Sequence, residues 1–171
     1  GYTNFGYLGW VSEAVCEREA LLGVSMTGVM DCPRIALDPE AQRNAAQIAV
    51  EANIDVAAKI GINSAARVTT GKPSGTASLV LGCVSAGFGL HHAQRYFRRI
   101  RANPQCPVYQ FFKKHNPHMC TMVDANKEFI TFTVKAPKGA LTRKDVNAIE
   151  FLDNIILSMK NWVLPGTAKP N

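Results

Sequence analysis

The sequence predicts an α/β fold with a substantially parallel sheet or barrel, and three observations lead to this prediction. Segments with the pattern of strands alternate along the chain with segments that have the pattern of helices. One predicted strand, residues 65–70, runs directly into a turn and a short helix. No internal repeat or low-complexity segment interrupts this order. Ligands of such folds bind at the carboxyl ends of the strands, so this turn is a candidate binding site.

The first half of the chain begins with a predicted helix over residues 12–22 and a predicted strand over residues 23–30. A long helix then starts at Asp38 and Pro39, because Asp suits the N-cap and Pro the first turn, and it extends to Gly61. Its predicted buried face consists of apolar residues that recur at helical spacing: Ala45, Ile48, Ala49, Ala52 and Val56.

The second half predicts a short helix over residues 76–81, a strand over 96–101 and a helix within 104–115. Residues 128–135 alternate with period two and predict a strand. One face of this strand carries Phe129, Thr131, Thr133 and Lys135, and the other carries Ile130, Phe132 and Val134. A second long helix is expected over residues 142–162, with a cap near Thr142 or Arg143 and an end at Pro165 and Gly166.

The composition indicates a soluble globular protein, since 47% of the 171 residues are hydrophobic and 19% are charged. No apolar run approaches the roughly 20 residues that span a bilayer, so we expect a cytoplasmic protein with no membrane partner. The formal net charge of +6 favours phosphorylated partners. No nucleic-acid partner is expected, because basic and aromatic residues form no repeated pattern along the chain. Much of the basic excess lies in Arg95, Arg98, Arg99, Arg101, Lys113 and Lys114.

Cysteine and histidine usage gives no indication of a metal site. The cysteines are an odd set of five, and no two of them have the two-residue spacing of zinc or thioredoxin-like sites. His91 and His92 are adjacent, so their rings point in different directions. His115 and His118 flank a proline. Each histidine is therefore expected to be a surface or hydrogen-bonded side chain, and no metal ligand is assigned.

The turn after the strand at 65–70 has the composition of a phosphate cradle. It combines hydroxyl side chains with a glycine and precedes a helix whose first N–H groups lack partners within the helix. It is not a Walker motif, because the upstream glycine and the hydroxyl after the lysine are both missing. A plain structural turn is the alternative. The candidate phosphate-binding residues are Pro73, Ser74, Gly75, Thr76, Ala77 and Ser78, with Lys72 as a supporting charge.

Residues 67–82, followed after a glycine-bearing loop by residues 95–101, resemble the corresponding part of adenosylcobalamin-dependent (class II) ribonucleotide reductases. Residues 23–31 are similar to a strand of that family's catalytic barrel. Residues 134–140 and 161–166 resemble the sequence that follows it, especially in the ribonucleoside-triphosphate reductase branch. The resemblance covers about residues 20–166, in the same order.

The resemblance implies that the whole chain, residues 1–171, is the C-terminal portion of a ten-stranded α/β barrel of the ribonucleotide reductase type, incomplete in this chain. In that family the turn that matches residues 73–78 binds the phosphates of the ribonucleotide substrate. The implied activity is radical reduction of ribonucleotides, and triphosphates above all, to deoxyribonucleotides. The implied cofactor is adenosylcobalamin, and the implied reductant is thioredoxin-like.

The chain departs from that family where the radical chemistry occurs. No Asn-x-Cys-x-Glu loop is present, since Cys16 precedes Glu17 directly and lies outside the matching region. No catalytic residue is therefore assigned. We expect both ends of the chain to be cuts from something larger. We expect a fragment or split subunit that is inactive alone and whose partner is the remainder of the reductase with the radical cysteine. The alternatives are a non-catalytic nucleotide- or phosphate-binding module, a basic nucleic-acid-binding protein, and a structural or assembly protein that binds no nucleotide.

Overall fold

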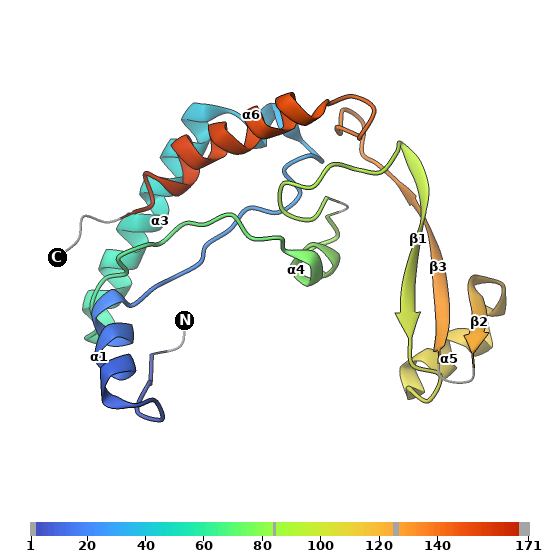
Figure 1. The fold of residues 1–171 in the computed structure, drawn as a ribbon, viewed down its shortest axis with the longest axis horizontal. Helices are drawn as coiled ribbons and strands as arrows, with labels where there is room; N and C mark the ends of the chain where they lie inside the picture. The colour runs from blue at the N-terminus through green and yellow to red at the C-terminus, as the bar shows by residue number, and fades with distance from the viewer. Residues whose placement is uncertain (1–2, 84, 125–126, 168–171) are drawn as a thin grey trace. The chain divides into compact units, whose positions relative to one another are not determined.

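The computed structural model describes residues 3–83, 85–124 and 127–167, and it combines helices with a small three-stranded sheet (Figure 1). The chain divides into two compact units. Unit 1 contains Gly1–His91 and Lys138–Asn171, and unit 2 contains His92–Pro137. The candidate phosphate turn belongs to unit 1, and the arginine-rich strand belongs to unit 2.

Unit 1 is mostly helical. Its helices are α1 (Trp10–Glu19), α2 (Pro33–Ala36), α3 (Pro39–Ile60), α4 (Gly75–Val80) and α6 (Ala148–Ser158), which continues into a π-helical turn, η2 (Met159–Val163). The long helix predicted from Asp38 to Gly61 is confirmed. The Asp38 carboxylate accepts a hydrogen bond from the Ala41 N–H at 2.7 Å, an N-cap that contributes about 1 kcal/mol. Gly61 ends the helix in the left-handed conformation, with φ of 73°.

The predicted buried face of α3 is wrong. Gln42, Ala46 and Ala57 are buried, whereas Ile48 is 65% exposed and Val56 is 51% exposed. Ala45 and Ala52 are exposed as well, and Ala49 is half-buried. The reason is a polar contact that helical periodicity does not reveal, because the buried Gln42 amide donates to Ala36 O at 2.6 Å and to Ser158 Oγ at 3.1 Å. This contact turns the polar edge of α3 toward α6.

Helix α6 begins six residues later than predicted. Thr142 does not cap it, because the backbone N–H and the hydroxyl of Thr142 both donate to the Asp145 carboxylate in a preceding turn. The N-cap is Asn147, which forms a capping box with Glu150. The predicted end is confirmed, since η2 stops at Val163 just before Pro165.

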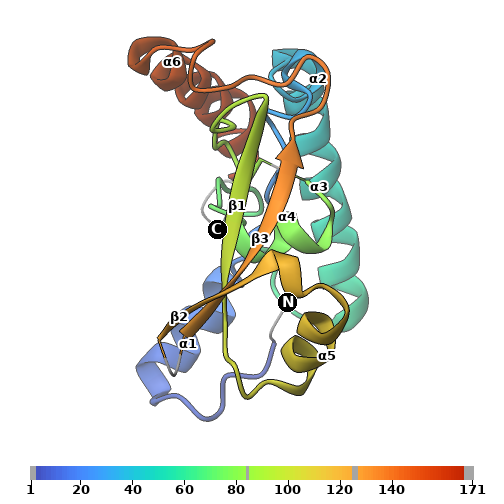
Figure 2. The ribbon, with the colours of Figure 1, turned by 90° about the vertical axis from the view of Figure 1, so that its right-hand side faces the viewer.

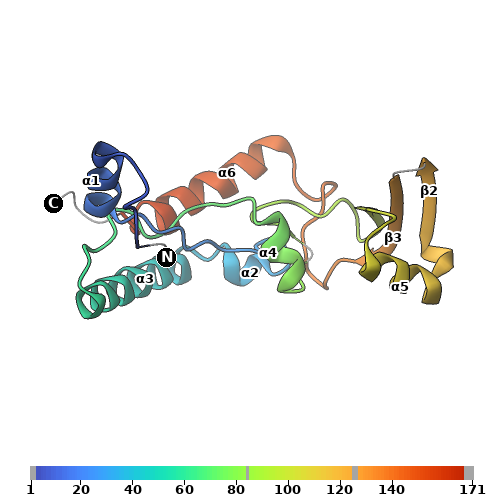
Figure 3. The ribbon, with the colours of Figure 1, turned by 90° about the horizontal axis from the view of Figure 1, so that it is seen from below.

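Two extended segments of unit 1 run side by side along one side of α3 and α6 (Figures 1 and 3). They correspond to the predicted strands at 23–30 and 65–70, and they pair in parallel at the bridge Val24↔Thr69. Hydrogen bonds from Val24 N to Val68 O and from Thr70 N to Val24 O, both of 2.9 Å, form this short ladder. The segments are therefore parallel, as predicted, but their pairing is too short to make a named strand.

Hydrogen bonds connect the second of these segments, residues 65–70, to η2 and to the residues that follow η2. Val68 N donates to Gly166 O at 2.8 Å, and the Trp162 indole donates to Thr70 O at 3.0 Å. In the opposite direction, the Thr69 hydroxyl donates to Trp162 O at 2.6 Å. Trp162, Thr69 and Val68 are all buried, so this joint is part of the core.

Unit 2 is an antiparallel sheet with a helix against one face (Figure 2). Its strands β1 (Arg95–Ala102), β2 (Cys120–Asp124) and β3 (Lys127–Lys135) have the order β1-β3-β2, and α5 (Pro107–His115) and the 3-10 turn η1 (Pro117–Met119) lie between β1 and β2 in sequence. The predictions of β1, α5 and β3 are confirmed. Strand β2 was not predicted, because four of its five residues are exposed and it lacks an apolar alternation.

The described residues form a small core. Ten hydrophobic residues are buried, five of them alanines, and none is a leucine, isoleucine or phenylalanine. Twenty-six large hydrophobic side chains in the same part of the chain are exposed. Within these ranges, isolated bridges, two parallel and one antiparallel, accompany the antiparallel sheet, so the structure is mixed α/β and does not itself contain a ten-stranded barrel. No described helix is long and apolar enough to cross a bilayer.

Candidate phosphate site

The candidate site is the turn between the extended segment 65–70 and helix α4. Ser74 adopts the left-handed conformation, with φ of 52° and ψ of 33°, and it is the residue from which α4 starts. The short helix predicted over residues 76–81 is confirmed, with a start at Gly75. The N–H groups of Gly75, Thr76 and Ala77 form the first turn of α4, which leaves them without partners inside the helix. They are donors for an anion.

The structure places the six predicted residues in two environments. Pro73, Gly75, Thr76 and Ala77 are exposed, and Ser74 is half-buried. Ser78 is fully buried, and its hydroxyl donates to Gly75 O at 3.1 Å. Ser78 therefore stabilises the first turn of α4 from inside. The Ser74 hydroxyl donates to Lys72 O at 3.5 Å, and the Thr76 hydroxyl belongs to an exposed residue and faces a ligand more freely.

Two neighbouring segments contact Lys72, the residue before the turn. One contains Gly23 and Ser25, and the other contains Gly87. The backbone N–H of Lys72 donates to Ser25 Oγ at 3.0 Å, and its ammonium lies beside Gly23, where an added methyl group would be 2.5 Å from Nζ. Gly87 has φ of 53°, and a methyl group there would overlap the Lys72 carbonyl oxygen. Only glycine allows this approach. The turn thus rests on two neighbouring segments.

A hydrogen bond between the buried His91 and Asp31 connects the loop that contains Gly87 to the segment at Asp31. His91 is 1% exposed, and its Nε2 lies 2.5 Å from Asp31 Oδ1, which also accepts from Ser85 N at 3.1 Å. His91 Nδ1 has no hydrogen-bond partner among the described residues. The expectation that His91 is a hydrogen-bonded side chain is confirmed. Its partner could not be predicted, because Asp31 is 60 residues away in sequence.

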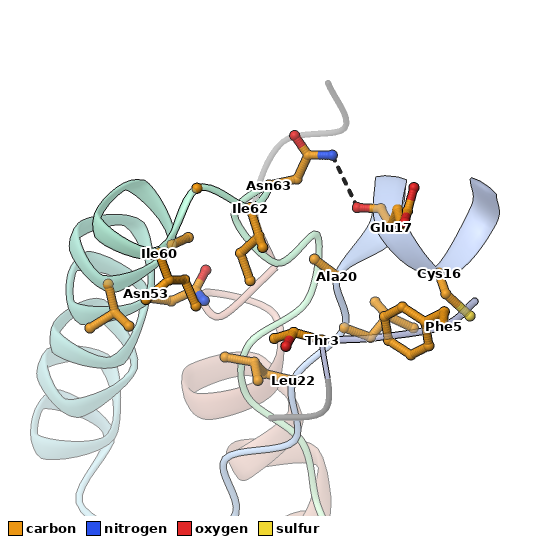
Figure 4. A pocket seen from close by; sticks show the side chains of 14 residues that line it. Thr3, Phe5, Cys16, Glu17, Ala20, Leu22, Asn53, Ile60, Ile62 and Asn63 are labelled. Carbon is orange, nitrogen blue, oxygen red and sulfur yellow. Dashed lines mark hydrogen bonds between the residues drawn. The ribbon is translucent and has the colours of Figure 1, made fainter. Parts of the chain in front are cut away.

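Unit 1 also contains a cavity of about 550 Å³ between α1, α3 and the segments that follow them (Figure 4). Its wall is largely apolar, with Phe5, Leu22 and Ile60 among the contributors. The two side-chain amides of the wall are already hydrogen-bonded to the backbone. Asn63 donates to Glu17 O at 3.0 Å, and Asn53 accepts from Ala65 N at 2.8 Å. No residue of the phosphate turn lines this cavity, so the two features are separate.

Unit 2 holds a second titratable cluster, which the sequence analysis missed. The Tyr109 hydroxyl and the Lys113 ammonium both donate to the Glu128 carboxylate, with Lys113 Nζ at 2.8 Å and 3.0 Å from its two oxygens. The hydrogen bond from Lys113, followed by that from Tyr109, holds the pKa of Glu128 below its usual value. Burial, reinforced by Glu128, raises the pKa of Tyr109. The cluster joins α5 to β3.

Metal chemistry finds no support in the described ranges. All five cysteines are free thiols, and no three His, Cys, Asp or Glu side chains of these residues gather closely enough to hold an ion. The candidate site offers an anion the backbone N–H groups of the first turn of α4 and the Thr76 hydroxyl.

The sequence matches no protein-family model, and no curated protein matches it. Among solved structures, the chain is similar to a crystal structure described as a B-12 dependent (class II) ribonucleotide reductase, with a TM-score of 0.72 and 20% sequence identity. The likeness shows a shared fold. It covers 93% of this chain but only 26% of the reductase chain, so this chain spans about a quarter of the length of that neighbour.

Proposed function

We propose that this chain is part of the catalytic barrel of a B12-dependent ribonucleotide reductase and that it supplies the turn that binds the substrate's phosphates. The observation that carries the proposal is the fold likeness over 93% of the chain. The residues that resemble the family's phosphate turn, 73–78, form a turn and helix start with exposed donors, as this role requires. The triphosphate substrate and the cytoplasmic location belong to the same proposal.

The chain's contribution is binding and orientation. Phosphate oxygens would accept hydrogen bonds from the N–H groups of Gly75, Thr76 and Ala77 and from the Thr76 hydroxyl, while Lys72 adds positive charge. Because Gly87 and Ser25 fix the backbone of Lys72 from behind, the donors would keep their positions when the substrate arrives. Such positioning lowers a reaction barrier without a reactive group of its own.

The described residues do not fit adenosylcobalamin. A corrin ring with its nucleotide loop and adenosyl group is larger than the cavity of about 550 Å³, which has the size of a site for a drug-sized ligand. The residues of that cavity are also mainly apolar or already hydrogen-bonded. We therefore assign the cobalamin, the radical cysteine and the contacts with a thioredoxin-like reductant to the remainder of the enzyme. No catalytic step is derived through them.

The phosphate site is tested by introducing a negative charge at the N-terminal end of α4. Thr76→Glu places a carboxylate among the three N–H donors, and it should lower the affinity for CTP and for inorganic tripolyphosphate tenfold or more. Thr76→Ala removes one hydroxyl and should weaken binding a few-fold, since one hydrogen bond contributes about 1 kcal/mol. Val80→Glu is the matched control, because Val80 is 81% exposed at the other end of the same helix. Isothermal titration calorimetry measures all three.

Unchanged affinity of the Thr76→Glu variant would refute the phosphate site. The reductase assignment has its own test, which is the sequence that flanks this chain in its reading frame, or a chain that co-purifies with it. That sequence should carry the Asn-x-Cys-x-Glu loop, and the assembled protein should reduce CTP when adenosylcobalamin and a dithiol are added. A remainder that lacks this loop would defeat the assignment even if the turn binds phosphate.

A further inference from the structure

The basic charge of the protein is concentrated in unit 2. Its residues, 92–137, include eight Lys and Arg but only two Asp and Glu, whereas the rest of the chain has eleven of each kind. The whole formal net charge of +6 therefore belongs to the small sheet unit. A unit with so strong a basic excess attracts polyanions.

The register of the sheet gathers part of this charge on one face. Arg95, Phe97, Arg99 and Arg101 alternate along β1, and their partners on β3 include Lys135, opposite Arg95, and Phe129, opposite Arg101. Side chains of directly paired residues lie on the same face of an antiparallel sheet. We call this the open face, and it consists of Arg95, Phe97, Arg99, Arg101, Phe129 and Lys135.

Helix α5 covers the other face. The residues of β3 that it contacts are Glu128, through Tyr109, and Phe132, whose ring centroid is 6.0 Å from that of Phe112. Glu128 and Phe132 have the parity opposite to that of Phe129, so α5 and the open face are on opposite sides of the sheet. No described element of unit 2 lies over the open face.

Five of the six side chains of the open face are exposed, and Phe129 is half-buried. Arg95, Arg99, Arg101 and Lys135 are exposed, and none of them forms an ion pair within the ranges that the structure describes. Phe97 is 71% exposed although it stands between arginines. Lys127 also lies on this side of β3, at the end of the sheet, where its ammonium is 5.6 Å from the centre of the Phe129 ring.

The arrangement is not explained by the protection of an edge strand. Charges on an edge prevent strands of other molecules from pairing with it, and β1 is an edge strand. However, Lys135 and Phe129 are on β3, the central strand, and protection of an edge gives no reason for an exposed aromatic ring among the charges. A ring that stands between two cations, about 6.7 Å from each along a strand, suits a chain of phosphates and bases.

We propose that the open face binds single-stranded nucleic acid. The arginines and Lys135 contact successive phosphates, and Phe97 and Phe129 stack against bases. The expectation of no nucleic-acid partner was based on the absence of a basic and aromatic pattern along the chain. The pattern arises across two strands, because pairing brings residues 95–101 beside residues 129–135. This inference does not depend on the proposed reductase function.

The test measures binding of the full chain to a fluorescein-labelled oligonucleotide of about 12 nucleotides, since sites on such surfaces span about 4–16. Fluorescence anisotropy is recorded over a range of salt concentrations. Combined Arg95→Glu, Arg99→Glu and Arg101→Glu changes should abolish binding. Single Arg→Gln variants should each reduce the slope of log affinity against log salt by about 0.7. Phe97→Ala should lower the affinity about tenfold at constant salt.

Three controls make the outcomes distinct. The variant with Lys138→Glu, Arg143→Glu and Lys144→Glu has the same change of charge at exposed residues of unit 1, and it should bind almost as the parent does. Heparin carries charge without bases, so Phe97→Ala should leave heparin binding unchanged. Thr76→Glu should leave oligonucleotide binding unchanged, which separates this test from that of the phosphate site.

The proposal is overturned if the parent does not bind, if both triple variants lose binding equally, or if Phe97→Ala affects neither ligand. The last result would indicate a general polyanion surface, such as one for an acidic protein. Circular dichroism confirms that each variant is folded. If the triple arginine variant does not fold, the salt slopes of the single Arg→Gln variants and the Phe97→Ala affinity decide the question.

Discussion

At the scale of single residues, the Lys113 and Glu128 pair makes unit 2 sensitive to pH. The hydrogen bond from Lys113 lowers the pKa of Glu128 from its ordinary value of 4.5, so folding favours the ionised carboxylate. A carboxyl with a lowered pKa stabilises the fold above its unfolded pKa, and this stability is lost as the pH falls through the folded value. The contribution of Glu128 should therefore be complete at neutral pH, begin to fall near pH 4.5 and be lost as the pH passes below the lowered folded pKa.

Lys113→Met tests this directly. The variant leaves the Glu128 carboxylate, whose side chain is 6% exposed, without its cation, so it should unfold at a lower temperature than the parent at pH 7. The difference between the two melting temperatures should shrink as the pH falls from 4.5 through the lowered folded pKa of Glu128, because the carboxyl is neutral in both proteins once the pH is below that value. Lys114→Met is the control, since Lys114 is the exposed neighbour and forms no ion pair with Glu128. A difference in melting temperature between Lys113→Met and the parent that is the same at all pH values would contradict this role of Lys113.

At the scale of elements, the joint between η2 and the segment 67–70 depends on the small size of Gly166. Its carbonyl accepts from Val68 N, and a methyl group on it would overlap the Thr69 side chain. Thr69 cannot move away easily, because it is buried and its hydroxyl donates to Trp162 O. The close approach of two backbones thus fixes the C-terminal helix against the segment that leads to the phosphate turn.

Gly166→Ala should destabilise unit 1 by about 2 kcal/mol, the usual cost of forcing an extra methyl group into a packed site. Gly9→Ala is the control. A methyl group at Gly9 meets nothing within 4 Å, so only the N-cap of α1 changes, at a cost below about 1 kcal/mol. Urea denaturation followed by circular dichroism measures both. If both substitutions lower the free energy of unfolding equally, Gly166 and Thr69 are less closely packed than the structure indicates.

At the scale of the whole molecule, the exposed stripe of α3 carries the apolar residues that were predicted to be buried. Ile48 and Val56 are both more than half exposed, and Ala45 and Ala52 are exposed beside them. A soluble protein rarely leaves such a stripe uncovered. Under the proposed function, the remainder of the reductase would cover it, since this chain spans only 26% of its structural neighbour.

The isolated chain should therefore self-associate as its concentration rises. Combined Ile48→Lys and Val56→Lys changes should shift it toward the monomer, and they should change the free energy of unfolding by less than about 0.5 kcal/mol, because both sites are exposed. Asn44→Lys with Ala58→Lys adds the same charge at exposed positions of α3 outside the stripe and should have little effect. Light scattering after size exclusion measures the mass. If the parent is monomeric at every concentration, the exposed stripe of α3 is not a contact surface for self-association.

The sequence predicted what depends on local signals. Asp38 and Gly61 mark the ends of α3, and the alternation along residues 128–135 gave the two faces of β3, because these features involve neighbours in the chain. The buried face of α3 and the start of α6 were wrong. Both depend on distant partners, such as Ser158 for Gln42, that no periodicity encodes. At the candidate site, the turn and helix start were predictable, whereas the burial of Ser78 and the support from Asp31 and His91 were not.

The division of the chain into two units has a consequence for the order in which it folds. Unit 2 is continuous in sequence, but it interrupts unit 1, whose parts lie before and after it. The hydrogen bonds from Gln42 to Ser158 and from Thr69 to Trp162 span 116 and 93 residues. Closing such long loops is slow compared with forming a local sheet. During synthesis on a ribosome, the small sheet can form while unit 1 still lacks its C-terminal helix. The segment before the phosphate turn gains its hydrogen bond to Gly166 only after that residue has left the ribosome.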